Sequence, residues 1–404
     1  MKVKAAPQDF VVQEESQLTL SRHRSGYAVY RLSKSSWDTF DLIDLLARRL
    51  GVGTADIGIG GMKDRYGSTE QMISVRGLRS PPERLEEANF SLSFAGWSEG
   101  PVSARAIRGN RFTITLRDLT AAEARLIERN TPVAASEGFP NYFDEQRFGS
   151  ARHGAGFMGK EMFLGRREKA LRLYFTPSKH DDQKTRKMKK CVIENWGHWA
   201  ACAGMGFGEY GRVLAYLAQN HRAFHQALEK IDRRFLLFVL NAYQSFLFNE
   251  LLARWLRELA AEHEFALRAV KYAFGAFEYF ETLPSEVGQR IRETVLPVPG
   301  YDTETADERI GGILAGILQE EGIKLSDLRV RQMSRIRVGG VPRAAIVIPE
   351  DLSATPAEPD ELYPGKSKAT LRFFLPRGSY ATLLIKRLTL PRAAGGKEES
   401  RQGQ

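Results

Sequence analysis

Hydrophobic residues in the first third of the chain fall into short runs that are typical of β-strands. Two runs are rich in β-branched and aromatic side chains, and residues 112–116 alternate apolar and polar positions, as a strand with one solvated face does. Residues 37–50 instead repeat Phe40, Ile43 and Leu46 at helical spacing, which predicts an amphipathic helix. The expected strands are residues 10–12, 27–32, 57–61, 72–75 and 112–116.

The middle of the chain has a different pattern, with apolar residues at helical spacing over most of residues 153–265. Residues 235–256 carry a dense apolar face and are expected to form a buried helix. Their longest purely apolar run, residues 235–240, is too short to span a bilayer. After residue 281 we expect irregular structure up to a second helical stretch at residues 310–328.

Strand patterns return near the C-terminus. Residues 344–348 and 370–374 are β-like, and residues 380–385 follow a Pro-Arg-Gly turn and are expected to start another strand. The order β-rich, helix-rich, β-rich is most simply explained by a helical domain inserted into an α+β domain. We therefore expect a discontinuous first domain, an inserted domain and a disordered polar tail, at residues 1–139 with 346–391, residues 140–345, and residues 392–404.

Composition narrows the class of protein. The chain has 404 residues, 43% of them hydrophobic, and a formal net charge of +10. This length suits two domains with well-formed cores, and the surplus of Lys and Arg favours phosphate-rich partners. The two cysteines, Cys191 and Cys202, belong to no Cys/His cluster, so we expect no structural zinc and a reducing, cytoplasmic compartment. The N-terminal residues contain no apolar signal-peptide core.

One loop is the first candidate for chemistry. Asp64 lies between Lys63 and Arg65, and glycines flank the three on both sides. Positive neighbours favour the ionised form of a carboxylate, and glycines allow tight turns and close approach by another molecule. An ionised carboxylate in a basic loop suits attack on an electron-poor carbon of a polyanionic substrate. Such a triplet is also common in solvated turns, so its role depends on what the fold brings beside it.

Three further segments carry residues suited to RNA. Residues 141–149 interleave aromatic, amide and Arg side chains, which can stack on bases and bind their edges or can equally pack between domains. Asn110 and Phe112 lie on one side of a strand and could hold one base; a turn amide before a core ring is the alternative. Residues 179–190 suit phosphate contacts or a solvated helix face. The residues of the first and third segments that we expect to contact RNA are Asn141, Tyr142, Gln146, Arg147, Lys184, Arg186, Lys187, Lys189 and Lys190.

Other enzyme signatures are missing from the sequence. It has no GxxxxGK[ST] phosphate loop, no HExxH, no GxSxG and no GxGxxG, and its histidines do not cluster at metal-ligand spacings. A hydrolase built on Asp144 and Glu145 is disfavoured, because adjacent side chains of an extended segment point apart.

Several separated motifs occur in a fixed order over most of the chain. They are DFVVQE at 9–14, GGMKDRYGSTEQ at 60–71, RGNRF at 108–112, NYFDEQRFG at 141–149, NAYQSFLFN at 241–249, LPVPG at 296–300 and LPRGSYAT at 375–382. Together they resemble the TruD family of tRNA pseudouridine synthases. Two positions depart from the family pattern: Asp144 stands where Gly is more usual, and Tyr380 where some members have Phe.

The resemblance implies an α+β fold: a pseudouridine-synthase core with a mixed or antiparallel sheet, and an inserted, mostly helical TRUD domain. It implies an isomerase, an intramolecular transferase that converts a uridine of tRNA, typically at position 13, to pseudouridine without a metal or organic cofactor. The family's catalytic aspartate falls on Asp64. The other positions that match the site are Lys63 and Arg65 beside it, the amide Asn110, the rings Phe112 and Tyr380, and the acidic Glu14.

The partner that follows from this resemblance is tRNA, with no membrane and no obligate protein partner, and the protein is expected to be a monomer. The target uridine has to be flipped out of its stack, and the rings Phe112 and Tyr380 could stack on it. Lys and Arg of both domains would hold tRNA phosphates in a cleft. The alternative is a non-catalytic tRNA-binding or chaperone protein using the same basic cleft, which would have no use for Asp64 between two cations.

Overall fold

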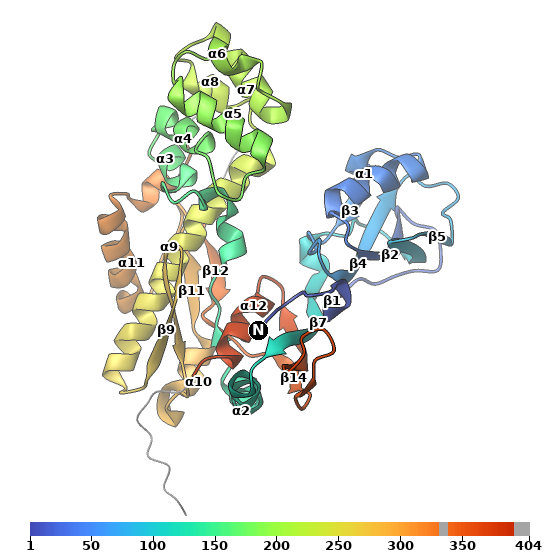
Figure 1. Cartoon of the computed structure of the whole chain (residues 1–404), viewed down its shortest axis with the longest axis vertical. Helices are drawn as coiled ribbons and strands as arrows, with labels where there is room; N and C mark the ends of the chain where they lie inside the picture. The colour runs from blue at the N-terminus through green and yellow to red at the C-terminus, as the bar shows by residue number, and fades with distance from the viewer. Residues whose placement is uncertain (331–337, 392–404) are drawn as a thin grey trace, which may run out of the picture. The chain divides into compact units, whose positions relative to one another are not determined.

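A computed structural model describes residues 1–330 and 338–391 of the chain. It divides into two compact units, one made of residues 1–139 together with the chain from 347 onward, and one made of residues 140–346. The second unit is therefore an insertion in the first, and Figure 1 labels several elements of each. The expected boundary at 345/346 lies one residue before the observed division. The expected tail at 392–404 lies outside the described residues.

The first unit is organised by a ten-stranded sheet in the order β14-β16-β7-β1-β4-β2-β6-β5, with β3 paired to β4 and β15 to β16. Strands β1 and β4 run parallel and the other neighbours antiparallel, so the sheet is mixed. All five strands expected from the first third of the sequence are present, as β1, β2, β3, β4 and β7. The strands are β1 (Phe10–Ser16), β2 (Tyr27–Ser35), β3 (Ile57–Ile59), β4 (Ser68–Arg76), β5 (Arg84–Glu87), β6 (Phe90–Ser98), β7 (Ile107–Leu119), β14 (Glu350–Ala354), β15 (Glu358–Pro359) and β16 (Ser367–Pro376).

Helix α1 (Thr39–Leu50) confirms the expected amphipathic helix. It begins at Thr39 because the Asp38 carboxylate accepts hydrogen bonds from backbone N–H groups of the first turn, and it ends at Gly51, which adopts the left-handed conformation at φ 67°. Leu42, Ile43 and Leu46 pack into a core with the inward faces of β2, β4 and β6, whereas Phe40 is exposed. The other helical segments of this unit are α2 (Ala121–Glu137), α12 (Ala381–Leu388), η1 (Pro7–Asp9), η2 (Thr54–Asp56) and η3 (Ala104–Ala106).

The strand expected at residues 380–385 is wrong, because this segment is helix α12. Tyr380 occupies the position before the first helical residue, and the buried residues Leu384, Ile385 and Leu388 then follow helical spacing. The helix packs against α2, where the amide of Asn130 donates to the carbonyl oxygens of Leu388 and Leu390, both at 2.9 Å. A short apolar run after a turn is compatible with a strand or a helix, and packing against α2 favours the helix.

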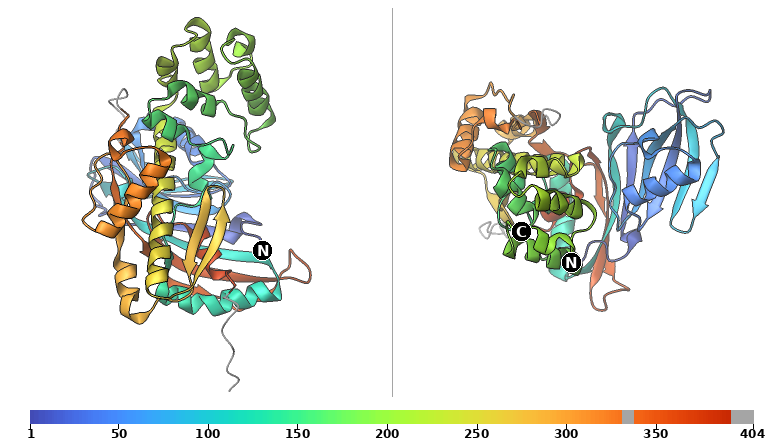
Figure 2. Two further views of the ribbon diagram at one scale, coloured as in Figure 1. Left: turned by 90° about the vertical axis from the view of Figure 1, so that its left-hand side faces the viewer. Right: turned by 90° about the horizontal axis from the view of Figure 1, so that it is seen from above.

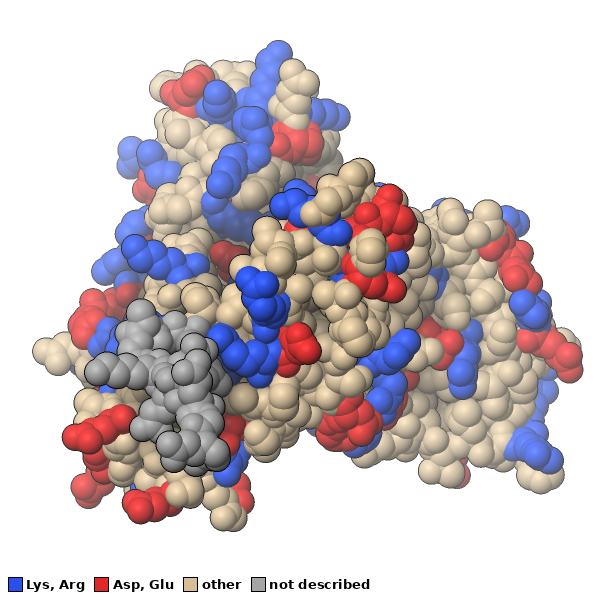
Figure 3. Space-filling model, turned by 60° about the horizontal axis from the view of Figure 1, so that its bottom comes forward, with Lys and Arg blue, Asp and Glu red and all other residues tan. Residues whose placement is uncertain are grey.

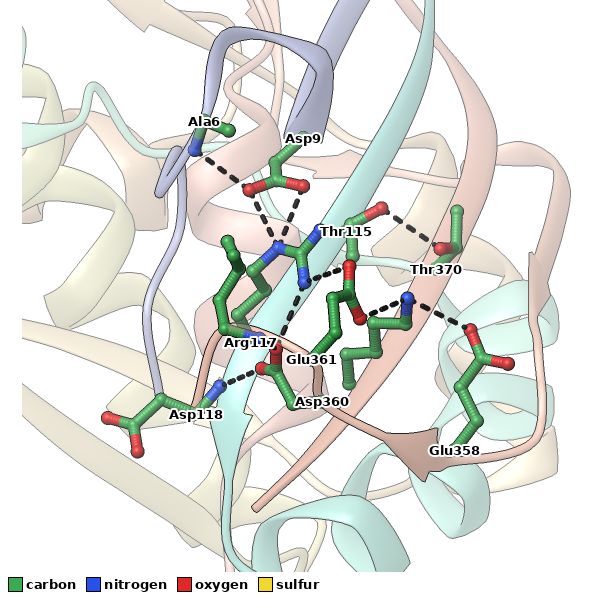
Figure 4. Close-up of polar contacts among 11 residues, drawn as sticks. Ala6, Asp9, Thr115, Arg117, Asp118, Glu358, Asp360, Glu361 and Thr370 are labelled. Carbon is green, nitrogen blue, oxygen red and sulfur yellow. Dashed lines mark hydrogen bonds and ion pairs between the residues drawn. The ribbon is translucent and has the colours of Figure 1, made fainter. Parts of the chain in front are cut away.

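A buried ion network fixes the segment that precedes β1 (Figure 4). The Arg117 side chain on β7 is only 7% exposed and donates to both carboxylate oxygens of Asp9 at 2.9 Å and to Asp360 at 3.0 Å. It also donates to one oxygen of Glu361 at 2.9 Å, and Lys368 forms an ion pair with the other oxygen at 2.6 Å. The main chains of Lys2 and Arg117 exchange two hydrogen bonds. The first nine residues are thereby tied to the sheet.

The second unit is mostly helical. The short helices α4–α8 gather at one end of the long helix α9 (Figure 1, Figure 2), and the hairpin β9–β10, the strand β11 and helix α11 pack along α9. Its elements are η4 (Glu145–Ala151), α3 (Met158–Phe163), α4 (Arg167–Tyr174), α5 (Gln183–Glu194), α6 (Ala200–Ala203), α7 (Gly208–Gln219), α8 (Phe224–Leu228), α9 (Arg233–Glu262), β9 (Leu267–Tyr272), β10 (Gly275–Phe280), α10 (Ser285–Glu293), β11 (Val295–Val298), α11 (Glu308–Glu321), η5 (Leu325–Leu328) and β12 (Val341–Ala344). The short strands β8 (Phe139–Pro140) and β13 (Ile346–Val347) pair where the chain passes from one unit to the other.

Helix α9 confirms the expected buried helix. Within the described residues it is the one helix with the length and apolar composition to cross a membrane, and 67% of its most apolar stretch is buried in the structure. This burial is what a core helix requires. The expected irregular region after residue 281 is partly wrong, because it contains α10; the helix expected at 310–328 is α11, which ends at Glu321 before the separate turn η5.

The two cysteines form a disulfide, which differs from the reduced thiols that we expected. Cys191 lies on α5 and Cys202 on α6, and their Cα atoms are 6.0 Å apart, a normal separation for this bond. The bond joins two helices through cysteines that are eleven positions apart in sequence. Sequence spacing alone could not show that these helices meet.

Candidate active site

The Asp64 loop connects β3 to β4 in the first unit, and two of its glycines are required by packing. A Cβ at Gly67 would lie 2.6 Å from the carbonyl oxygen of Phe10, and one at Gly60 would lie 2.4 Å from the side chain of Ile107. Both distances are shorter than any normal contact, so only glycine fits. The glycines therefore allow β1 and β7 to approach the loop, while Gly61 has open space around it.

The Asp64 carboxylate is held at both oxygens and remains 23% exposed. One oxygen accepts the backbone N–H of Tyr66 at 3.0 Å, and the other forms an ion pair with the ammonium of Lys4. Lys4 also lies over the ring of Phe10, 4.1 Å from its centroid. A carboxylate in this arrangement is oriented and charge-compensated but still open to a substrate.

Lys63 and Arg65 do not pair with Asp64, although the sequence suggested that these two cations keep its carboxylate ionised. Lys63 turns away from Asp64; its ammonium is 2.6 Å from a Glu14 oxygen and donates to the Asn110 amide oxygen at 2.8 Å. Arg65 is exposed, with its guanidinium 5.8 Å from the Tyr66 ring centroid. Neighbouring side chains of an extended loop point in different directions, so the counter-ion of Asp64 comes from a distant segment.

Glu14 and Asn110 are brought together with Lys63 by the pairing of β1 and β7, in which the two residues lie directly opposite each other. The Glu14 side chain is fully buried and also accepts the backbone N–H of Met72 at 3.2 Å. A buried carboxylate is tolerable only when it is paired and hydrogen-bonded, as it is here. The three residues form a connected polar group that fixes the base of the loop.

Phe112 follows Asn110 on the same face of β7 but is only 7% exposed. Its ring stacks on Phe373 at 5.2 Å between centroids and meets the edge of Phe10 at 6.2 Å. Phe112 is therefore part of the aromatic core beneath the site. This corrects the expectation that its ring stacks on a flipped base. Tyr380 is half-buried at the start of α12, five residues after Leu375, which pairs with Asn110.

The sequence analysis did not identify two site residues beside Asp64. They are the most exposed large apolar side chains among the described residues. Met62 is 68% and Tyr66 is 66% exposed. Lys4 was also missed, because nothing in its local sequence identifies a partner 60 residues away. Lys34 had a signal: the inward positions of β2 are Ala28, Tyr30, Leu32 and Lys34, so strict alternation places a lysine inside.

The aromatic segment 141–149 of the second unit is largely structural. Asn141 is buried, donates to the carbonyl oxygen of Ala344 and accepts from Arg343 at 2.7 Å. Tyr142 is fully buried, and its hydroxyl bonds the main chain of Glu278; desolvation raises the pKa of this hydroxyl well above its usual value. The RNA contacts expected of these two residues are therefore corrected to core packing. Gln146 is exposed, and Arg147 donates to Ser245.

The five expected cations of α5 fall into two groups. Arg186 donates to the carbonyl oxygens of Lys179 and Asp181, and Lys189 is buried against the Asp181 carboxylate at 3.1 Å. The RNA contact expected of Lys189 is therefore corrected to a structural role, whereas Arg186 is half-buried and its RNA contact stays a prediction. Lys184, Lys187 and Lys190 are exposed at a spacing of three. Over the face drawn in Figure 3, Lys and Arg side chains are interspersed with Asp and Glu rather than joined in one patch. No group of side chains with metal-ligand geometry occurs in residues 1–330 and 338–391.

Comparison with known proteins agrees with this fold and site. The family model described as tRNA pseudouridine synthase D (TruD) matches residues 1–388. The chain is 30% identical over 400 residues to the "Probable tRNA pseudouridine synthase D 1" of Methanococcus maripaludis, covering 96% of this chain and 99% of the relative. It is 26% identical over 397 residues to the tRNA pseudouridine synthase D of Aquifex aeolicus, covering 96% and 98%.

A solved structure shows the same architecture. It is described as the putative tRNA pseudouridine synthase D (TruD) from Methanosarcina mazei and matches with a TM-score of 0.70 and 26% identity, covering 96% of this chain and 93% of that one. The mixed sheet, the inserted helical unit and the aspartate loop thus define a pseudouridine-synthase fold. More narrowly, the chain belongs to the TruD family of tRNA pseudouridine synthases.

Proposed function

We propose that this protein isomerises a uridine of tRNA, at position 13, to pseudouridine, with Asp64 as the catalytic carboxylate. One observation carries the proposal: Asp64 is exposed to a substrate while Lys4 and the Tyr66 amide hold its two oxygens. Binding alone would not need a preorganised anion in a site for a polyanion. Catalysis does, because preorganised charge lowers the barrier without reorganisation during the reaction.

The chemistry conserves atoms and electrons. The bond between N1 of uracil and C1′ of ribose breaks, the base rotates, C5 bonds to C1′, and the proton leaving C5 is balanced by one gained at N1. Asp64 acts either by attack on the sugar or by assisting a glycal-like intermediate. The buried group Lys63, Glu14 and Asn110 holds the loop in place for either route.

The exposed side chains around the carboxylate suit an extruded nucleotide. A base that leaves its stack loses a few kcal/mol of stacking and pairing, which new contacts have to offset. Met62 and Tyr66 present apolar surface on either side of Asp64, and Arg65 adds a cation to the same exposed loop. We expect Tyr380 to contribute a further ring. Phosphates elsewhere on the tRNA would be held by exposed cations, including Lys184, Lys187 and Lys190.

The decisive experiment incubates the purified protein with unmodified tRNA transcripts and maps pseudouridine by carbodiimide-dependent stops in reverse transcription. We expect one modified uridine, at position 13. Asp64→Asn should abolish it while tRNA binding stays within a few-fold. Asp44→Asn, at an exposed aspartate of α1, is the matched control and should keep full activity. Full activity of Asp64→Asn would refute the catalytic assignment, and binding without modification by the parent protein would favour the non-catalytic alternative.

A further inference from the structure

A lysine is buried directly beneath the loop that carries Asp64. Lys34, near the end of β2, is only 2% exposed and lies on the inward face of the strand, in line with the core residues Tyr30 and Leu32. Its ammonium donates to the main-chain carbonyl of Asp64 at 3.0 Å and to that of Trp37 at 2.8 Å. It therefore binds the backbone of the very residue whose side chain is the candidate catalyst.

The surroundings of Lys34 give no reason to expect that its buried ammonium stabilises the fold. Burial lowers its pKa, and the nearby carboxylates of Asp38 and Asp64 only partly oppose this while Lys63 adds to it. An enclosed ammonium costs free energy that an apolar side chain of similar length would not. Opposite Lys34 on β4 stands Thr69, and two residues on is Gln71; both are buried, and their side-chain polar atoms find no hydrogen-bond partner among the described residues. A polar strip thus interrupts an apolar sheet face at the loop.

The rest of the loop backbone is held from the neighbouring helix. The hydroxyl of Thr39, the first residue of α1, accepts the N–H of Lys63 and donates to its carbonyl oxygen, both at 3.3 Å. Lys34 and Thr39 thus secure the main chain of two consecutive residues. Lys4 and the Tyr66 N–H act on the Asp64 carboxylate instead.

We propose that Lys34 is a positioning residue for the candidate reaction: by binding the Asp64 carbonyl it sets where the carboxylate stands relative to a flipped nucleotide. This rests on the proposed function of Asp64. Removing the ammonium leaves Lys4 in place, so Asp64 keeps its counter-ion but loses its fixed position. Misplacement of a reacting group by about 1 Å is enough to slow a reaction roughly 100-fold.

The test compares the parent protein with Lys34→Met, which keeps the apolar stem and removes the donor. Single-turnover pseudouridine formation, tRNA affinity and melting temperature are measured for each. We expect the rate to fall by about 30- to 100-fold, the affinity to stay within about 3-fold, and the melting temperature to stay equal or rise. An unchanged rate overturns the proposal. So does a fall in melting temperature with a parallel loss of affinity and rate, because that pattern describes a purely structural lysine.

Two further measurements separate this proposal from the function on which it rests. Lys34→Ala supplied with butylammonium should recover part of the rate, whereas butanol should not; equal recovery by both overturns the role of the charge. Amide hydrogen exchange of residues 60–67, measured without RNA, should speed up in Lys34→Met and not in Arg31→Met, which alters the exposed face of the same strand. If the parent protein modifies no tRNA, the proposed function fails, while this exchange still reports whether Lys34 holds the loop.

Discussion

Two cation-rich segments of the chain look alike in sequence and differ in the structure. The Asp64 loop lies in the first unit and helix α5 in the second. Around the loop, Lys4, Lys34 and Lys63 are each assigned a different partner, namely a carboxylate, a main-chain carbonyl and the Glu14–Asn110 pair. On α5, Lys184, Lys187 and Lys190 remain at the surface. Burial ties a charged side chain to one particular protein partner, because a buried charge has to be paired, whereas an exposed charge is solvated by water.

The largest effect should come from Arg117, a buried cation that is paired with three carboxylates. Arg117→Met leaves the buried carboxylates of Asp9 and Asp360 without their partner. We expect the free energy of unfolding to fall by about 3–5 kcal/mol, measured by urea denaturation. Arg125→Met, at an exposed arginine of α2, should change it by less than about 0.5 kcal/mol. Equal effects of the two substitutions would contradict the distinction between enclosed and exposed cations.

The next effect concerns the ion pair at the candidate catalytic carboxylate. Lys4→Met should lower the rate of pseudouridine formation by about 100-fold with tRNA affinity nearly unchanged, because the charge it removes acts on Asp64 and not on the RNA backbone. Lys2→Met changes an exposed lysine two residues earlier and should leave the rate within about 2-fold. A loss of affinity that accounts for the whole effect of Lys4→Met would place Lys4 among the RNA-binding cations instead.

A smaller effect is expected on α5. Replacing Lys184, Lys187 and Lys190 together by Ser should weaken tRNA binding about 10-fold at low salt and reduce the slope of log affinity against log salt by at most about 3. The control replaces Arg22, Arg48 and Arg79, exposed cations of the first unit, for the same change in net charge. An equal loss in the control would mean that α5 contributes general charge and no contact surface.

The smallest effect appears only in acid. Hydrogen bonds from Lys368, the backbone and Arg117 lower the pKa of Glu361 from 4.5 to about 2. The folded protein therefore keeps this carboxylate ionised where the unfolded chain is protonated, so its stabilising contribution is complete above pH 4.5 and is lost as the pH falls toward 2. Urea midpoints between those limits should fall less steeply for Glu361→Gln than for the parent protein. Parallel slopes would show that other carboxylates control the acid response.

The local elements were predictable because their causes are local. The β-branched and aromatic content of β2, the helical spacing of apolar residues in α1 and the apolar face of α9 are all visible in the sequence, and the structure confirms these elements. Helix α12 was mistaken for a strand because a run of eight residues satisfies both patterns until α2 is packed against it. Periodicity decides the type of an element only when the run is long.

For the candidate site, the sequence by itself determined which residues belong to it more than how their side chains are arranged. The motifs around Asp64, Asn110 and Tyr380 identify the family and the loop, because each motif is defined by residue types at short spacing along the chain. Only the tertiary structure decided that Lys4, not Lys63, pairs with Asp64, that Lys34 holds its backbone, and that Phe112 and Tyr142 are enclosed. The physical reason is that ion pairs, hydrogen bonds and burial are set by distances across strand pairings, and a linear pattern contains no such distances.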